Sequence, residues 1–167
     1  MSIRLAVAPD IDRVVEITRA CNLFMRSQGI FQWTDKYPSK NSFLNDLKRE
    51  ELYVLEEKNQ IIGCIVISTF MDEVYRPVKW LTKNTSHIYI HRIAIHPENQ
   101  GKGNAQKLMN YAEDYAREKA FVSVRLDTFS QNPRNMRFYE TRGYERLETI
   151  QFPEQSEFPF YCYEKVL

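Results

Sequence analysis

The spacing of apolar and polar residues changes period along the chain, and each period predicts a different element. Residues 2–7 are typical of a short strand, and residues 10–25 then place apolar side chains on one face at helical spacing. The aromatic segment 27–38 breaks that period, after which the apolar positions of 43–47 indicate a second, shorter helix. The chain is therefore expected to begin with a strand and two helices joined by an aromatic loop.

Apolar segments in the middle of the chain are predicted as strands. Residues 52–55 and 61–67 are rich in β-branched side chains and are separated by a charged turn, which indicates an antiparallel hairpin. Residues 71–86 are polar and irregular. Residues 87–91 then alternate with a period of two before the apolar run 93–95, so we expect a strand with one face more polar than the other.

The second half of the chain contains the clearest helix. Residues 104–116 keep their apolar side chains at the spacing of one helical face, and residues 122–126 alternate as a strand does. Asn132 followed by Pro133 is typical of a helix N-terminus, and Gly143 stands where a residue of left-handed conformation ends a helix. A further strand and a further helix are therefore expected here.

Two strand candidates, residues 144–152 and 160–167, complete an element order that predicts an α/β domain. Its central strand-helix-strand part should form a right-handed parallel crossover, and ligands of such sheets favour the carboxyl ends of the strands. A chain of 167 residues has the size of one ordinary domain, so residues 1–167 are expected to form a single domain.

Charge and cysteine content exclude several classes of protein. The formal net charge is +1 with both signs interspersed, which does not suit a nucleic-acid partner, so a phosphate ligand would have to be bound locally. Charged residues interrupt the first twenty positions, so neither a signal peptide nor a membrane span is expected and the predicted location is cytoplasmic. Cys21, Cys64 and Cys162 are widely spaced, so we expect buried thiols and no metal site.

A pair of glycines between the strand that ends at Ile95 and the clearest helix is the most informative local feature. Glycines at such a turn let backbone N–H groups approach a ligand, and the helix N-terminus adds partial positive charge, which predicts a phosphate cradle. Gly103 is followed by Asn104 and Ala105, so neither a Walker loop nor a dinucleotide fingerprint fits. An ordinary capping turn is the alternative.

These residues resemble a known family. Gln100-Gly101-Lys102-Gly103-Asn104-Ala105 is similar to the [Q/R]-x-x-G-x-[G/A] pyrophosphate-binding motif of the GNAT acyltransferase superfamily. Residues 132–144 resemble the family's later N-x-x-A-x-x-[FY]-Y-E-x-x-G-[FY] signature, in the expected order. The resemblance covers roughly residues 87–147, and the departures are Asn104 and Asn135, where the family usually carries apolar or small residues.

The resemblance implies a mixed, mostly antiparallel sheet of about seven strands flanked by about four helices, with a parallel central crossover. It implies an N-acetyltransferase that moves an acetyl group from acetyl-CoA to a primary amine of a small molecule or peptide by direct attack, without a metal. A non-catalytic CoA-sensing or protein-binding module on the same fold is the alternative. The cofactor contacts carried over are Ile93, Ala94, Ile95, Gln100, Gly101, Lys102, Gly103, Asn104, Ala105, Asn132 and Arg134.

Such an enzyme needs a proton donor for the leaving thiolate and a proton acceptor for the ammonium. The resemblance assigns the donor role to Tyr139, whose alternative is a core aromatic residue. For the acceptor role, Tyr89 and His91 lie with His87 on one face of a predicted strand, and His91 has a pKa suited to neutral pH. A proton path through water is equally open.

The acceptor amine is expected against the least patterned segments. Trp33, Tyr37 and His87 are the candidate contacts, although aromatic residues in a loop more often pin it to the core. Acidic residues in two of these loops favour a cationic acceptor, with solubility as the plainer explanation of their presence. The aromatic run at 158–163 fits a homodimer contact as well as a core.

Overall fold

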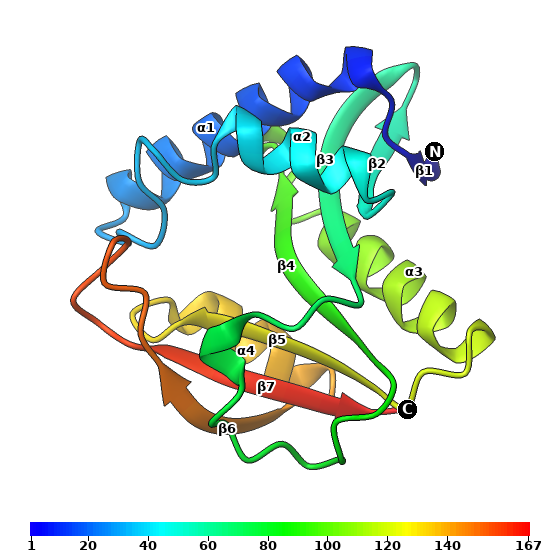
Figure 1. The fold of residues 1–167 in the computed structure, drawn as a ribbon. Coiled ribbons are helices and arrows are strands. Elements are labelled where there is room, and N and C mark those ends of the chain that lie inside the picture. Colours follow the sequence, from blue (N-terminus) through cyan, green and yellow to red (C-terminus); the bar gives the residue numbers. More distant parts are fainter. The chain divides into compact units, whose positions relative to one another are not determined.

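The computed structural model describes residues 1–167 and confirms the predicted element order. The helices and strands in chain order are β1 (Ser2–Leu5), α1 (Ile11–Ser27), α2 (Lys40–Lys48), β2 (Leu52–Glu57), β3 (Gln60–Ser68), β4 (His87–Ile95), α3 (Asn104–Glu118), β5 (Ser123–Phe129), α4 (Pro133–Thr141), β6 (Glu145–Ile150) and β7 (Phe160–Val166) (Figure 1). The strands form one sheet in the order β1-β2-β3-β4-β5-β7-β6. The β4–β5 pair is parallel and the other pairs with a defined register are antiparallel, as the expected fold class requires.

The chain divides into two compact units, which are described separately. Unit 1 contains Met1–Ile67 and His91–Ala112, and unit 2 contains Ser68–Ile90 and Glu113–Leu167. Strand β4 and helix α3 each contribute residues to both units. The single domain expected from the chain length stays a prediction. None of the helices combines the length and the apolar character needed to cross a bilayer.

The apolar face predicted for the first helix forms the core of unit 1. Side chains of α1 such as Val14 and Ile17 are fully buried against Val54 of β2 and Cys64 of β3. Tyr53, which points to the other side of β2 because strand side chains alternate, packs on Tyr111 of α3 with ring centroids 5.3 Å apart. Helices α1 and α2 therefore cover one face of the hairpin strands, and α3 covers the other (Figure 1).

Strands β2 and β3 form the predicted hairpin, closed by Lys58 and Asn59 with φ of 51° and 63°. Gly63 in β3 faces the end of β4 so closely that a Cβ atom on it would lie 2.8 Å from the carbonyl oxygen of Ala94 and 2.4 Å from Cδ1 of Ile95. Glycine is required here because a methyl group would push the β4 backbone away. The end of β4 is thus held tightly in unit 1.

Unit 2 is built on the first part of β4 and on β5, β7 and β6. Ile88 pairs with Val124 in the parallel register, and Leu126 pairs with Tyr163 in the antiparallel one. Val122, expected within the strand, precedes β5 and is 40% exposed. All but one of the β5 residues are buried, so the strand is covered on both faces.

Helix α4 begins and ends where the sequence indicated. The side chain of Asn132 accepts a hydrogen bond from the N–H of Asn135 at 3.1 Å, and Pro133 occupies the first turn. Gly143 has φ of 87°, and the N–H of Tyr144 bonds back to the carbonyl of Tyr139 at 3.1 Å. These caps fix the ends of α4, and Tyr139 on this helix is buried.

Candidate active site

The glycine pair has the backbone conformation of an anion cradle. Gly101 and Gly103 have φ of 73° and 76°, whereas Lys102 between them does not have a positive φ. Alternation of positive and negative φ in successive residues can turn their N–H groups toward one side, a geometry that binds anions. A Cβ atom on either glycine would meet no other heavy atom within 4 Å. The loop therefore suits a pyrophosphate group.

Side chains of the cradle fasten the loop to its own carbonyl groups. Nε2 of Gln100 donates to the carbonyl of Ile95 at 2.9 Å, and Nδ2 of Asn104 donates to the carbonyl of Asn99 at 3.0 Å. Nζ of Lys102 lies 2.8 Å from the carbonyl of Glu98 and is exposed. Asn104, the departure from the family pattern, is thus buried and stabilises the turn. These contacts leave the ligand-binding role to the backbone of the loop.

The end of β4 leads into this loop. Ala94 and Ile95 are buried and Ile93 is half-buried. The carbonyl of Ile95 accepts a second hydrogen bond, from Sγ of Cys21 at 3.1 Å, and burial raises the pKa of that thiol to about 12. Cys21 is therefore a neutral, structural thiol, and all three cysteines are buried and free, as expected.

Tyr37 and Trp33, the predicted acceptor contacts, belong to the packing of unit 1. Trp33 is 8% exposed and lies in the core cluster, and Tyr37 packs against that cluster. The guanidinium of Arg92 donates to Tyr37 Oη at 2.9 Å and to both carboxylate oxygens of Asp46 at 2.6 Å. This arrangement supports the plainer alternative, in which the aromatic residues pin their loop to the core. An acceptor role for them stays a prediction.

Tyr139, the predicted proton donor, is a buried member of an aromatic cluster. It is 4% exposed, and its ring lies 5.8 Å from that of Tyr144 and 6.0 Å from that of Tyr163. Burial raises the pKa of Tyr139 well above its ordinary value, and the negative charge of Asp127 adds to this effect. The phenol is therefore protonated at neutral pH, which suits a proton donor.

Two other predicted residues lie at the start of α4. Asn132 is buried and caps the helix, whereas Arg134 is exposed in the first turn. The cap role of Asn132 is confirmed by its hydrogen bond to Asn135. Cofactor contacts from Asn132 and Arg134 stay predictions.

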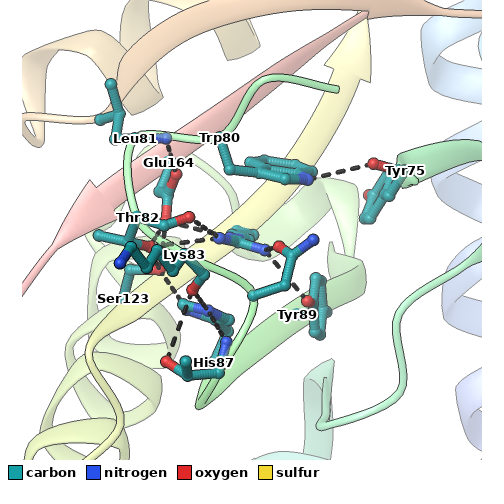
Figure 2. Close-up of polar contacts among 12 residues, drawn as sticks. Tyr75, Trp80, Leu81, Thr82, Lys83, His87, Tyr89, Ser123 and Glu164 are labelled. Carbon is teal, nitrogen blue, oxygen red and sulfur yellow. Dashed lines mark hydrogen bonds and ion pairs between the residues drawn. The ribbon is translucent and has the colours of Figure 1, made fainter. Parts of the chain in front are cut away.

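His87 and Tyr89 belong to a buried polar cluster around Arg125. Figure 2 shows His87 and Tyr89 together with Ser123 and Glu164 of this cluster. Nδ1 of His87 lies 2.9 Å from Oγ of Ser123, and its Nε2 lies 2.6 Å from the carbonyl of Lys83. Burial lowers the pKa of His87, so its ring is neutral at pH 7. Tyr89 Oη accepts a hydrogen bond from Arg125 at 3.3 Å. Both side chains are thus engaged in holding the structure together.

Arg125 and Glu164 form the centre of this cluster, and both are 0% exposed. The Arg125 side chain donates to Glu164 at 3.0 Å, to Asn84 at 2.6 Å and to the carbonyl of Thr82 at 2.8 Å. Its guanidinium also lies 4.5 Å from the ring of Trp80. The segment that the sequence left as an irregular loop is therefore fastened to β5 and β7.

The Glu164 carboxylate is fully hydrogen-bonded. It accepts from the N–H of Leu81 at 2.6 Å, from Ser123 Oγ at 2.6 Å and from the Thr82 hydroxyl, in addition to Arg125. Burial on its own would raise the pKa of Glu164, but the hydrogen bonds and the guanidinium outweigh it, so the pKa lies below its ordinary value. The charge of Glu164 is fully compensated inside the protein.

Asp127 lies two residues further along β5 and is the only residue of that strand that is not buried. Tyr75, fully buried at the end of the short turn Glu73–Tyr75, donates its hydroxyl hydrogen bond to Oδ2 of Asp127. Burial raises the pKa of Asp127 to about 7, the Tyr75 hydrogen bond lowers it, and the charge of Asp72 raises it. This carboxyl therefore titrates near neutral pH.

His91, the other candidate for the proton acceptor, belongs to unit 1. It is half-buried in the second part of β4, where it precedes Arg92. Its predicted catalytic role is untested by this arrangement and stays a prediction.

Sequence reasoning missed the residues around β5. Ser123, Arg125 and Asp127 alternate with Val124 and Leu126, and such alternation is usually typical of a strand with one solvated face. The signal that marks them is the placement of two opposite charges within an otherwise apolar strand. Their partners could not be found in this way because Glu164 and Tyr75 are distant in the sequence.

Comparisons of the sequence with known proteins identify relatives of this chain. The model of the acetyltransferase (GNAT) family matches residues 12–144. The uncharacterized N-acetyltransferase YesJ of Bacillus subtilis is 20% identical over 142 residues, which is 84% of this chain and 79% of that protein.

Solved structures share the fold. A GNAT-family acetyltransferase from Streptococcus agalactiae 2603 is 23% identical, with a TM-score of 0.86, over 99% of this chain and 95% of that one. The PaiA N-acetyltransferase of Thermoplasma acidophilum, solved in complex with coenzyme A, is 18% identical with a TM-score of 0.71, over 99% and 98% of the two chains. The family match spans most of the chain and includes the cradle and Tyr139, and this chain therefore belongs to the acetyltransferase (GNAT) family.

Proposed function

We propose that this N-acetyltransferase takes the acetyl group from acetyl-CoA and transfers it directly to a primary amine. The amine belongs to a small molecule or to a peptide, in keeping with the family to which the chain belongs. The proposed cofactor contacts are the backbone of Ile93 to Ile95 for the pantetheine amides and residues 100–105 for the pyrophosphate. Asn132 and Arg134 are proposed as further contacts.

The observation that carries the proposal is the cradle itself. Two glycines of left-handed conformation stand at the junction of β4 and α3, with open space on the side where Cβ atoms would project. Gln100 and Asn104 use their side-chain donors on nearby carbonyls, so the N–H groups of the turn and of the first helical turn are the donors that an anion would meet. The complex of the PaiA protein with coenzyme A supports the same ligand for this fold.

The proposed proton donor to the leaving thiolate is Tyr139. Its raised pKa keeps the phenol protonated, and its packing between Tyr144 and Tyr163 restricts the ring to one position. A positioned acid of this kind contributes to the rate because the thiolate would otherwise leave as a free anion. A homodimer formed through the 158–163 segment and a cytoplasmic location stay predictions.

Thermal unfolding with increasing acetyl-CoA tests the cradle. A ligand that binds only the folded state stabilises it by about 2.7 kcal/mol at ~100 times its dissociation constant, so the wild type should show a saturable rise in Tm. Gly101→Ala should lose most of that rise, because alanine disfavours the φ of 73° and adds a methyl group to the open side of the turn. Gly29→Ala is the matched control, with φ of 74° and equally open surroundings outside the cradle.

Both variants should lose a similar amount of stability without ligand, and only Gly101→Ala should lose the response to acetyl-CoA. Equal responses in the two variants would contradict the cradle assignment.

Steady-state kinetics with saturating acetyl-CoA test Tyr139. Tyr139→Phe should lower kcat by about 10- to 1,000-fold while the response of Tm to acetyl-CoA stays unchanged. Tyr144→Phe, which alters a neighbouring ring of the same cluster, should keep a kcat close to that of the wild type. Full turnover by Tyr139→Phe would remove the assignment.

A further inference from the structure

The cap at the end of helix α4 includes Tyr139. The N–H of Gly143 donates to the carbonyl of Glu140 at 3.0 Å, and the N–H of Tyr144 donates to the carbonyl of Tyr139 at 3.1 Å. These two bonds define a Schellman motif, in which the side chains at its two ends often pack together. The rings of Tyr139 and Tyr144 lie 5.8 Å apart. The position of Tyr139 therefore depends on this cap.

A glutamate of α3 binds the side chains of the same cap. Arg142 donates to Oε1 of Glu113 from Nε at 3.3 Å and from Nη2 at 2.8 Å, and the hydroxyl of Tyr144 donates to the same oxygen at 3.2 Å. The N–H of Arg142 also donates to the carbonyl of Tyr139 at 3.0 Å. Both residues whose N–H groups bind the carbonyl of Tyr139 at the end of α4 thus have side chains that end on one carboxylate oxygen.

The other oxygen of Glu113 connects the cap to the sheet of unit 2. Oε2 accepts a hydrogen bond from Nζ of Lys165 on β7 at 2.8 Å. Burial on its own would raise the pKa of Glu113, but Lys165 and Arg142 outweigh it, so the pKa lies below its ordinary value. Glu113 is therefore charged at neutral pH, and it links α3, the end of α4 and β7.

The place of Glu113 on its helix is one that an apolar side chain usually occupies. It lies one turn after Met109 and three residues before Ala116, both of which are 0% exposed, and is itself 4% exposed. Moving a carboxylate and its cations out of water is costly, so a buried ion pair is weak evidence for a gain in stability. A requirement for defined geometry at the cap is the better explanation of a glutamate here.

The electrostatics of the cap also act on Tyr139. Burial raises the pKa of this phenol, whereas the positive charge of Arg142 lowers it. A phenol that gives up its proton becomes negatively charged, and a nearby guanidinium stabilises that charge. Because Glu113 binds the guanidinium, it fixes where this positive charge lies.

We propose that Glu113 is a positioning residue for the proton donor, which it holds in place through Arg142 and the cap of α4. This inference rests on the proposed function, in which the C–S bond breaks and the sulfur takes the proton of Tyr139. Glu113 itself neither gives nor takes a proton. The hold runs through the charged Arg142, because Tyr144 contacts Tyr139 with its ring and keeps that contact without its hydroxyl.

The first test measures steady-state kinetics with ethylamine and 1,4-diaminobutane at saturating acetyl-CoA. Glu113→Gln keeps the shape of the side chain and removes its charge, so kcat should fall about 10- to 100-fold because a slightly displaced acid is less effective. KM for acetyl-CoA and the response of Tm to acetyl-CoA should stay unchanged. Asp114→Asn, the matched control at an exposed position of the same helix, should keep the wild-type kcat. A wild-type kcat in Glu113→Gln would overturn the proposal.

A double variant separates positioning from a purely structural role. If Glu113 acts through the phenol, Tyr139→Phe combined with Glu113→Gln should be no slower than Tyr139→Phe alone. Losses that multiply would show that Glu113 affects turnover independently of Tyr139, and this result would overturn the proposal.

A further variant covers the case in which Glu113→Gln does not fold. Arg142→Lys leaves Glu113 paired with Lys165 and keeps the positive charge, but it removes the two-donor contact of the guanidinium. Its urea midpoint should be close to that of wild type, and its kcat should fall by about 3- to 30-fold. Full turnover by a folded Arg142→Lys protein would contradict the proposal.

The last measurement does not depend on turnover. The ¹³Cζ chemical shift of Tyr139, assigned by its loss in Tyr139→Phe, should change in Glu113→Gln, while that of Tyr53 in unit 1 should not. An unchanged Tyr139 signal would overturn the proposal even if no test amine is acetylated. Failure of the proposed function is recognised separately, by a wild-type protein whose Tm does not respond to acetyl-CoA.

Discussion

Arg125 and Asp127 lie on the same face of β5, two residues apart, but only the charge of Arg125 has a counterion in the protein. Arg125 is fully buried and meets Glu164, Asn84, Thr82, Tyr89 and Trp80, so its charge is compensated within the protein. Asp127 receives one hydrogen bond from Tyr75 and has no cation beside it. A compensated charge stabilises the fold, whereas an uncompensated one remains available to a ligand.

The directions of the pKa shifts express the same difference. The pKa of Glu164 lies below its ordinary value because its hydrogen bonds and Arg125 outweigh the cost of burial. The pKa of Asp127 is raised to about 7, because burial outweighs the single hydrogen bond from Tyr75. Perturbed carboxyls of the second kind are candidates for proton transfer at neutral pH.

The largest effect is expected from removing the counterion of Arg125. Glu164→Ala leaves the Arg125 guanidinium buried without its counterion, which should lower the free energy of unfolding by about 3–5 kcal/mol. Urea denaturation measures this change. Asp35→Ala, which removes an exposed partner of Arg26, should cost less than about 1 kcal/mol. A Glu164→Ala protein as stable as the control would show that the cluster contributes little.

Acid should weaken the compensated charges together. The folded-state pKa values of Glu164, Glu113 and Asp10 are lowered, so the stability that these groups contribute is complete above their ordinary values of 4.5 and 3.8. That contribution is lost as the pH falls through the folded-state values. The urea midpoint should therefore decrease from pH 6 to pH 3. An unchanged midpoint would contradict the assigned directions.

The contribution of Asp127 to stability should change with pH in the opposite direction. Folding favours the protonated form of Asp127, so wild type loses stability as the pH rises from about 4 to the folded-state pKa of about 7. Asp127→Asn removes this penalty and should raise Tm at pH 8 relative to wild type, with no gain at pH 4. Calorimetry at the two pH values measures the difference. A lower Tm at pH 8 would indicate that the carboxylate is compensated after all.

The smallest effect is expected from removing the hydrogen bond that Tyr75 donates to Asp127. Tyr75→Phe removes the donor that lowers the pKa of Asp127, so the pKa of this carboxyl, followed by its ¹³C chemical shift, should move to higher pH by roughly one unit or less. The Asp127 pKa in Tyr161→Phe, whose ring lies beside Arg146 on β7, should stay unchanged. A shift to lower pH in Tyr75→Phe would contradict the role given to the phenol.

Much of the fold was predictable because its signals are local. The helical period of residues 10–25 and 104–116 and the hairpin of β2 and β3 were confirmed with small changes in their bounds. The cap at Asn132 and the left-handed glycine at 143 were also confirmed. Each of these signals depends on residues within a few positions of one another, so no knowledge of the rest of the chain was needed.

The candidate site was predictable only in part. Gly101 and Gly103 could be recognised because a left-handed turn before a helix selects glycine. His87 and Tyr89 were correctly placed on one strand, yet their contacts with Ser123, Lys83 and Arg125 depend on other elements. The period of a strand predicts which side chains share a face, but it does not predict which elements cover that face.

By itself the sequence determined the order of the elements, the glycine cradle at the start of α3 and the place of Tyr139 on a capped helix. Only the tertiary structure decided that Arg125 is neutralised and Asp127 is not. Arg125 and Glu164 are 39 residues apart, and Tyr75 and Asp127 are 52 residues apart. Whether a charge is compensated depends on what folding brings beside it, and no local pattern contains that information.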